Sequence, residues 1–217
     1  MSLEKRRAGL REKVQRKRQE RQKLGVQIAR LVERIKRLTR KIKSRRRRGL
    51  PNWLPDRFAE QWRKPWTVGA DSKSDAEFKR LIWSKGYASP HFLLAEAGGK
   101  LRHPLGCDVP EALRHNCQYH AFRLEVARHK LGDKPMRPGS WYRCPRHNSA
   151  VGGASASQHM QAWATDWFSD ERARHGGERF DAVMNDVFAN GGRGYQGYIG
   201  GPIRHTDNGP KRQWVYA

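Results

Sequence analysis

The basic residues of this chain are concentrated at one end, and this asymmetry limits what the chain can fold into. Residues 1–50 contain 21 Lys and Arg side chains against four acids, so they carry 17 of the 24 net positive charges. The remainder, residues 51–217, has a net charge of only +7, which is compatible with a packed globular domain. We therefore expect a cationic arm followed by one domain of ordinary size.

The arm has the periodicity of a long helix with one apolar face. Apolar residues recur in steps of three and four, at Leu10, Val14, Leu24, Ile28, Leu31, Ile35, Leu38 and Ile42. This heptad pattern is typical of coiled coils, so self-association is one expectation. A monomeric, partly frayed helix is the other, because Lys17 and Arg21 occupy the same register and would repel across a dimer. Gly49 and Pro51 then end the helix, which gives an arm over residues 1–49.

A segment this basic attracts polyanions. Its charge alone does not distinguish an anionic cell-wall polymer from anionic lipid or nucleic acid, and a solvated helix face without a ligand is the alternative. The sequence shows neither the apolar run of a signal peptide nor a stretch of the roughly 18 apolar residues that a membrane span needs. Ordinary secretion and membrane insertion are therefore not expected.

Two further segments follow the arm. Residues 50–87 hold Trp53, Trp62, Trp66 and Trp83, which favour a connector packed against its domain over a surface that stacks on bases or sugars. Residues 88–217 have a globular pattern, with helices expected at 109–130 and 178–188 and short strands at 138–142, 163–168, 202–206 and 213–216. This pattern predicts an α+β fold with a small antiparallel sheet and helices. The glycine pairs at 191–192 and 200–201 are expected to form turns.

The chain has three cysteines, Cys107, Cys117 and Cys144. They form no CxxC pair and no even framework, so neither a disulfide scaffold nor a thiolate zinc site is indicated. We expect buried small apolar residues or free thiols.

Two short segments carry residues that bind metals. His159 and Asp166 lie seven positions apart, where a loop leads into an expected strand. His205 and Asp207 alternate on another expected strand and therefore share one of its faces. Imidazole and carboxylate groups are good zinc ligands, and three of them leave a fourth position for the water that a catalytic zinc needs. Arg143 lies upstream and would bind a substrate carboxylate or a developing oxyanion, unless it is an ordinary surface arginine.

The residues around these ligands resemble the M15 zinc peptidases, a family of D-alanyl-D-alanine carboxypeptidases and peptidoglycan endopeptidases. The resemblance is carried by SWYRCPRHNSAVGGASASQHMQAWATDW at residues 140–167, by HFLLAE at 91–96 and by RHTDNGPKRQW at 204–214. It covers roughly residues 88–217, with about a dozen motif positions in order. We therefore assign residues 88–217 to an M15-like domain.

The resemblance implies a zinc ion on His159, Asp166 and His205, with Arg143 as the arginine that binds substrate or transition state. It also implies the compact α+β fold shared with the Hedgehog signalling domain. The chain departs from the pattern at two positions. Ala162 stands where many members have glycine, and Pro202 stands where some branches place an acid. Asp207 is then the nearest carboxylate that would act as general base.

This resemblance implies Zn²⁺-dependent hydrolysis of amide bonds in peptidoglycan stem or cross-link peptides. Together with the basic arm it favours a cell-wall lytic enzyme, such as a bacteriophage endolysin or a virion-associated lysin. Such a protein would be made in the cytoplasm and act at the cell wall after release. The alternative is a catalytically silent, Hedgehog-like zinc-binding module with a polyanion-binding arm, which the proline at position 202 would explain.

Overall fold

The computed structural model of this chain describes residues 3–47, 49–51, 53–64, 72–100 and 104–216. The chain divides into two compact units, Met1–Ala59 and Glu60–Ala217. Trp66 of the predicted connector lies outside the described residues. The predicted boundaries at residues 49/50 and 87/88 stay predictions.

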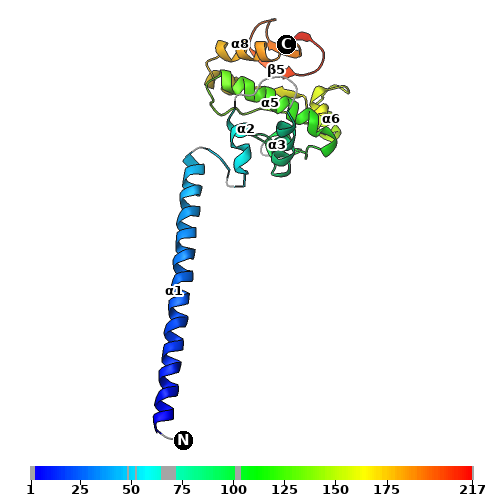
Figure 1. Ribbon diagram of the computed structural model, residues 1–217. Coiled ribbons are helices and arrows are strands. Elements are labelled where there is room, and N and C mark those ends of the chain that lie inside the picture. Colours follow the sequence, from blue (N-terminus) through cyan, green and yellow to red (C-terminus); the bar gives the residue numbers. More distant parts are fainter. Residues whose placement is uncertain (1–2, 48, 52, 65–71, 101–103, 217) are drawn as a thin grey trace. The chain divides into compact units, whose positions relative to one another are not determined.

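The first unit consists mainly of one helix. Helix α1 spans Leu3–Arg47, as Figure 1 shows, and the expected helical arm is therefore present. Every side chain from Leu24 to Ile42 is exposed. A 3-10 turn, η1, follows at Asp56–Phe58. Within the described ranges, the structure contains no helix both long and apolar enough to cross a membrane.

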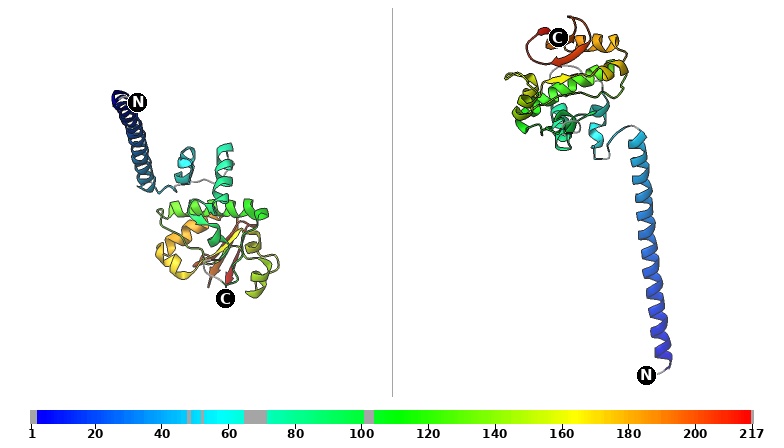
Figure 2. Two further views of the ribbon diagram at one scale, coloured as in Figure 1. Left: turned by 90° about the horizontal axis from the view of Figure 1, so that it is seen from below. Right: turned by 180° about the vertical axis from the view of Figure 1, so that it is seen from behind.

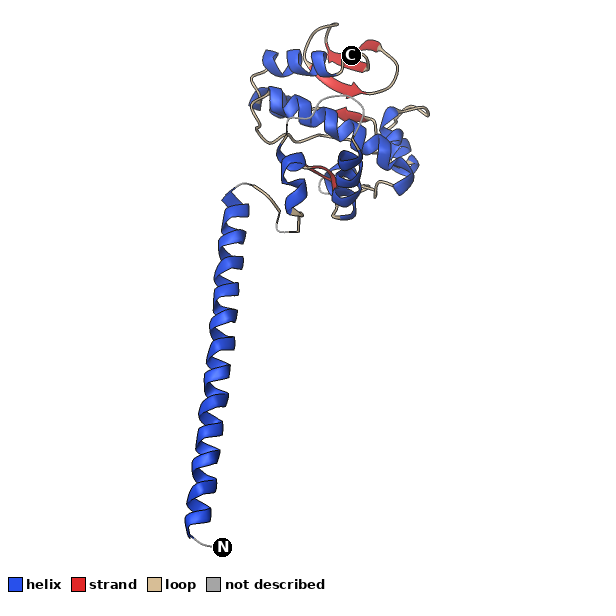
Figure 3. Ribbon diagram, viewed as in Figure 1, coloured by secondary structure: helices blue, strands red, loops and turns tan. Residues whose placement is uncertain are grey.

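The second unit combines short helices with two small sheets (Figure 3). Its helices are α2 (Ala59–Arg63, which begins at the unit boundary), α3 (Lys73–Ser84), α4 (Leu94–Ala97), α5 (Arg114–Lys130), α6 (Pro145–Ala150), α7 (Ser169–Arg174) and α8 (Glu178–Val187), with 3-10 turns η2 (Glu111–Leu113) and η3 (Gln158–Gln161). Its strands are β1 (Tyr87–Ser89), β2 (Phe92–Leu93), β3 (Ala164–Asp166), β4 (Gly192–Gln196), β5 (Ile203–Asp207) and β6 (Arg212–Tyr216).

The larger sheet has the strand order β3-β5-β4-β6. Strand β5 pairs antiparallel with β3 and with β4, and the smaller sheet is an antiparallel pair of β1 and β2. The predicted α+β class with a small antiparallel sheet is confirmed. At the edge, β6 runs parallel to β4 and so adds one parallel pair.

Helices α5 and α8 cover one face of this sheet (Figure 2). From α5, His120 is fully buried, with its Nε2 2.6 Å from the Thr165 hydroxyl of β3. From α8, the side-chain oxygen of Asn185 accepts a hydrogen bond from the Tyr195 hydroxyl of β4. Because side chains alternate along a strand, Asp166, the neighbour of Thr165, points to the opposite face. That opposite face is where the predicted metal ligands lie.

Strand β4 was not expected, since Gly191 and Gly192 were predicted to form a turn. Gly192 instead begins the strand, and a side-chain Cβ on it would collide with the carboxylate of Asp207. A Cβ on Gly194 would come within 3 Å of the rings of Trp214 and Tyr216. These glycines are strand residues that make room for larger side chains on the neighbouring strands.

The expectation of three unpaired cysteines was wrong. Cys107 and Cys144 form a disulfide, and only Cys117 is a free thiol, buried in the core as expected. Burial raises the pKa of the Cys117 thiol. The two paired residues are 37 positions apart in the sequence, and an odd cysteine count gives no indication of such a pair. The link ties the segment around Cys107 to the residue that follows Arg143.

Removing this disulfide should destabilise the second unit. A closed loop of this length restricts the unfolded chain by about 3–4 kcal/mol. We expect Cys107→Ser, or reduction of the wild type, to lower the free energy of unfolding by up to that amount, measured by denaturant titration. Cys117→Ala is the matched control, because its effect should be the same with and without reductant. An equal midpoint for oxidised and reduced wild type would contradict the prediction.

Candidate metal centre

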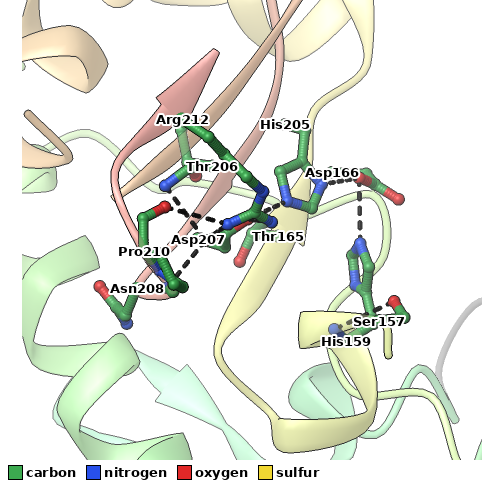
Figure 4. Close-up of polar contacts among 12 residues, drawn as sticks. Ser157, His159, Thr165, Asp166, His205, Thr206, Asp207, Asn208, Pro210 and Arg212 are labelled. Atoms are coloured by element: carbon green, nitrogen blue, oxygen red, sulfur yellow. Dashed lines mark hydrogen bonds and ion pairs between the residues drawn. The ribbon is translucent and has the colours of Figure 1, made fainter. Parts of the chain in front are cut away.

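The three predicted metal ligands come together in the second unit. One ligand atom from each of His159, Asp166 and His205 lies within 4.8 Å of the other two. The Oδ1 atom of Asp166 is 3.2 Å from His159 Nε2 and 2.8 Å from His205 Nδ1 (Figure 4). This group of two imidazoles and one carboxylate could hold a metal ion, and it suits zinc.

The backbone explains how these residues meet. Asp166 of β3 is paired directly with His205 of β5, so their side chains lie side by side on one face of the sheet. His159 comes from η3, the 3-10 turn that precedes β3. This turn ends at Ala162, whose φ is +56°. A left-handed residue at this point explains why glycine would be favoured there, and alanine adopts it at some cost in backbone strain.

Hydrogen bonds on the far side of each imidazole fix which nitrogen is free. The Nδ1 atom of His159 is 2.6 Å from the carbonyl oxygen of Trp141, which can only accept, so Nδ1 carries the proton. In the same way, Nε2 of His205 is 2.9 Å from the Asp207 carboxylate and donates to it. The remaining nitrogen of each ring faces Asp166, to which it can donate when the ring is protonated. In the neutral ring this nitrogen carries a lone pair instead, which is the protonation state that a metal requires.

The electrostatics of the three groups are strongly coupled. Burial lowers the pKa of His159. Burial alone would raise the pKa of Asp166, but its hydrogen bonds with His159 and His205 bring that pKa well below its usual range. For His205, burial acts to lower the pKa, and the bonds to Asp166 and Asp207 outweigh it, so the pKa is raised. A cation at this point therefore competes with a proton on His205.

The position of Asp207 does not favour its predicted role as general base. Its side chain is 0% exposed and lies behind His205, away from the ligand cluster. Its oxygens accept hydrogen bonds from the amides of Gly192 and Gly209 and from Arg212. Burial raises its pKa, but the bond from His205 and the charge of Arg212 bring it down to about 2. Such a carboxylate is ionised and fully hydrogen-bonded, as expected for a group that orients a ligand.

Arg143 is not an ordinary surface arginine. Its guanidinium donates to Oδ2 of Asp166, the oxygen that faces away from the two histidines, and to the hydroxyl of Ser140. Its backbone amide donates to the carbonyl of His159 at 3.1 Å. The arginine is therefore held beside the cluster by both its main chain and its side chain.

The cluster opens into a cleft of about 770 Å³. Residues 151–154 and 156–158 line one part of it, and the carboxy-terminal segment lines another with Arg212, Trp214 and Tyr216. The ring of Trp214 lies 5.0 Å from that of His205, and the Arg212 guanidinium lies over the Trp214 ring. Sequence reasoning did not assign a role to these three residues, although Trp214 belongs to the closing segment of the M15 resemblance.

Comparisons with known proteins match the region around this cluster. Residues 95–195 match the model of the family described as Peptidase M15. A stretch of 53 residues is 42% identical to the zinc D-Ala-D-Ala carboxypeptidase of Streptomyces albus G. This stretch is 24% of the present chain and 21% of that relative, so the chain spans about a fifth of the relative's length. The family match includes Arg143, His159 and Asp166 but ends before His205.

The orientation of His205 by Asp207 can be tested by metal binding. Asp207→Asn keeps the shape of the side chain but removes the charge that holds the Nε2 proton of His205. We expect the affinity for Zn²⁺, measured by calorimetric titration, to fall about 10–100-fold. Asp186→Asn, an exposed acid on α8, should leave the affinity unchanged. Unchanged affinity in Asp207→Asn together with lost hydrolysis would instead support a role as proton acceptor.

Proposed function

We propose that this chain is a zinc-dependent peptidase of the M15 type that acts on peptidoglycan, and the match of residues 95–195 to the family model supports this. Its substrates are amide bonds in the stem or cross-link peptides of the cell wall. The observation that carries this proposal is the convergence of His159, Asp166 and His205, with both histidine tautomers already set for a metal, beside an open cleft.

The donor set fits the zinc ion that the family implies. Two neutral imidazole nitrogens and one carboxylate oxygen are the ligand types of a catalytic zinc site that keeps a position open. Bound there, zinc would polarise a carbonyl oxygen and make water a stronger acid. We assign the binding of zinc to His159, Asp166 and His205.

Three residues around the ligands have supporting roles in this proposal. Arg143 holds the outer oxygen of Asp166 and presents positive charge at the cleft, where it offsets negative charge on the substrate or on the tetrahedral intermediate. Trp141 and Asp207 accept the outer protons of His159 and His205 and fix both rings. Asp207 is thus a positioning residue rather than the proton acceptor.

The cleft suits an extended peptide with small side chains. Gly152, Gly153, Ala154 and Ala156 line it without occupying much of its volume. Trp214 and Tyr216 supply an aromatic surface among the lining residues. Alanine-rich stem peptides, whose side chains are mostly small, would fit between these two groups of residues.

We further propose that the enzyme lyses cell walls, as a bacteriophage endolysin or a virion-associated lysin does. In this scheme residues 88–217 form the peptidase domain, residues 50–87 connect it, and residues 1–49 form the basic arm. Support comes from the charge of the arm, which would attract the anionic polymers or lipids of a cell envelope. Nucleic acid would be bound by the same charge but has no role in this reaction.

A second candidate function is a zinc-binding module without catalysis, similar to the Hedgehog domain. One observation favours it: among the described residues that line the cleft, Asp166 is the only carboxylate. Its outer oxygen is engaged by Arg143, and Asp207 is buried. A module of this kind would bind zinc as tightly as the enzyme but would release no peptide.

Digestion of purified peptidoglycan separates the two candidates. We expect the full chain to release peptides detectable by mass spectrometry, to lose this activity with a chelator and to regain it with added Zn²⁺. His159→Ala should abolish both zinc binding and hydrolysis, whereas His115→Ala, an exposed histidine on α5, should retain both. Stoichiometric zinc binding without any released peptide would establish the silent module instead.

Arg143 provides a test of the proposed stabilisation of charge. We expect Arg143→Ala to lower kcat about 10²–10³-fold, the usual effect of removing one group that stabilises an oxyanion. Zinc content, measured by mass spectrometry of the native protein, should stay at one ion per chain. Arg146→Ala removes an exposed arginine three residues away and should keep full activity. A kcat of Arg143→Ala equal to the wild-type value would contradict the assigned role.

A further inference from the structure

Helix α1 carries a row of apolar side chains that nothing in its own unit covers. Leu24, Ile28, Leu31, Ile35, Leu38 and Ile42 are between 44% and 61% exposed, although each is a residue type that normally packs in a core. We propose that residues 24–42 of two chains pair along this row as a parallel, two-stranded coiled coil. The proposal concerns assembly and does not depend on the proposed peptidase activity.

The identity of the residues in the row indicates the number of strands. In heptad notation, isoleucine occupies all three a positions, at Ile28, Ile35 and Ile42, and leucine occupies all three d positions, at Leu24, Leu31 and Leu38. A β-branched residue at a with leucine at d favours two-stranded parallel coils over trimers and tetramers. The residues of the row therefore favour a dimer, in which the helix of one chain pairs with the same helix of a second chain.

The flanking positions indicate the orientation of the two helices. The e positions hold Gly25, Val32 and Thr39, none of which is charged, while two of the g positions are Arg34 and Lys41. In a parallel coil each g side chain faces an e side chain of the partner, so these bases meet neutral residues. In an antiparallel coil g positions face each other, and the bases would repel.

The remaining charges set the limits of the pairing. Towards the amino terminus, the next two seam positions are Arg21 and Lys17, which would meet their own copies and end the paired segment there.

On the outer face, Arg30, Lys36, Arg37 and Arg40 point to solvent with Glu33 as their only acid, so two aligned arms repel at long range. This predicts a dimer that tightens as salt is added, because salt screens the repulsion.

A lipid surface is a less suitable partner for this row. An interfacial helix generally presents a broad apolar face with aromatic residues at its edge. The row in residues 24–42 is an a/d seam of aliphatic residues, which Val32 at an e position and Val26 at an f position widen only locally, and this segment contains no aromatic residue. The narrow stripe matches a coiled-coil partner more closely than it matches a membrane.

Analytical ultracentrifugation of the full chain tests the pairing. We expect wild type to sediment as a dimer whose dissociation constant falls as NaCl is raised from low to high concentration. Ile35→Glu, which places two like charges in the seam, should raise that constant at least roughly 100-fold. Its matched control is Lys36→Glu, the next residue, which points outward and should remain dimeric. A monomeric wild type, or a dimer that withstands Ile35→Glu, would overturn the proposal.

Cross-linking tests the orientation. Arg21→Cys places a thiol at a seam position just before the paired segment. In a parallel dimer the two thiols lie next to each other and should oxidise to a covalent dimer on a non-reducing gel. In an antiparallel dimer centred on the same seam they would be about 36 Å apart. Wild type is the control, because its free thiol, Cys117, is buried. A dimer that does not cross-link through position 21 would rule out the parallel arrangement.

Binding to phosphatidylglycerol vesicles tests the alternative partner. A wild-type chain that stays monomeric and binds these vesicles would favour a membrane surface as the partner of the row.

Discussion

The pairing of Asp166 with His205 across β3 and β5 is the contact on which the rest of the second unit depends. It places a carboxylate and an imidazole side by side on one face of the sheet, where the turn before β3 adds His159. The opposite face of the same strands carries Thr165 and Thr206, which hydrogen-bond to His120 and Trp167 on the side of the helices. A slip of one residue in this register would bury the ligands under α5 and expose the core.

This arrangement buries ionised groups, and each of these buried charges has a partner of opposite charge. His205 lies between two carboxylates, and each of these is held in turn by an arginine, Arg143 for Asp166 and Arg212 for Asp207. Removing one member of such a chain leaves a buried charge without compensation, which costs far more than the pair contributes. The absence of side chains at Gly192 and Gly194 provides the space in which Asp207 and Trp214 complete this network.

Several features were predictable from the sequence because they depend on local pattern. The long helix follows from its heptads, and α8 from its apolar spacing. Helix α5 begins at Arg114, a few residues later than the pattern indicated, because Pro110 precedes a 3-10 turn. The ligands were indicated by residue type, and the structure places the three side chains together.

The features that sequence reasoning missed depend on contacts between distant residues. Strand β4 was taken for a turn because its glycines are explained only by the side chains of β5 and β6 that lie over them. The Cys107–Cys144 pair has no local signal, and the strand expected at residues 138–142 is reduced to one bridge between Ser140 and Asp166. Asp207 lies two positions after His205 on the same strand, a spacing that predicts that both side chains face the cleft. Only the three-dimensional structure shows that the imidazole lies between Asp207 and the ligand cluster.

The Cys107–Cys144 disulfide also makes the state of the protein depend on its chemical surroundings. Cys144 directly follows Arg143, so the covalent link ends one residue after the arginine that holds the outer oxygen of Asp166. Disulfides persist in oxidising compartments and are generally lost where thiol buffers keep cysteines reduced. The redox potential of its environment would thus decide how firmly the arginine side of the cleft is anchored. In a reducing environment this covalent anchor would be lost, and the Arg143 side chain would be held by its hydrogen bonds alone.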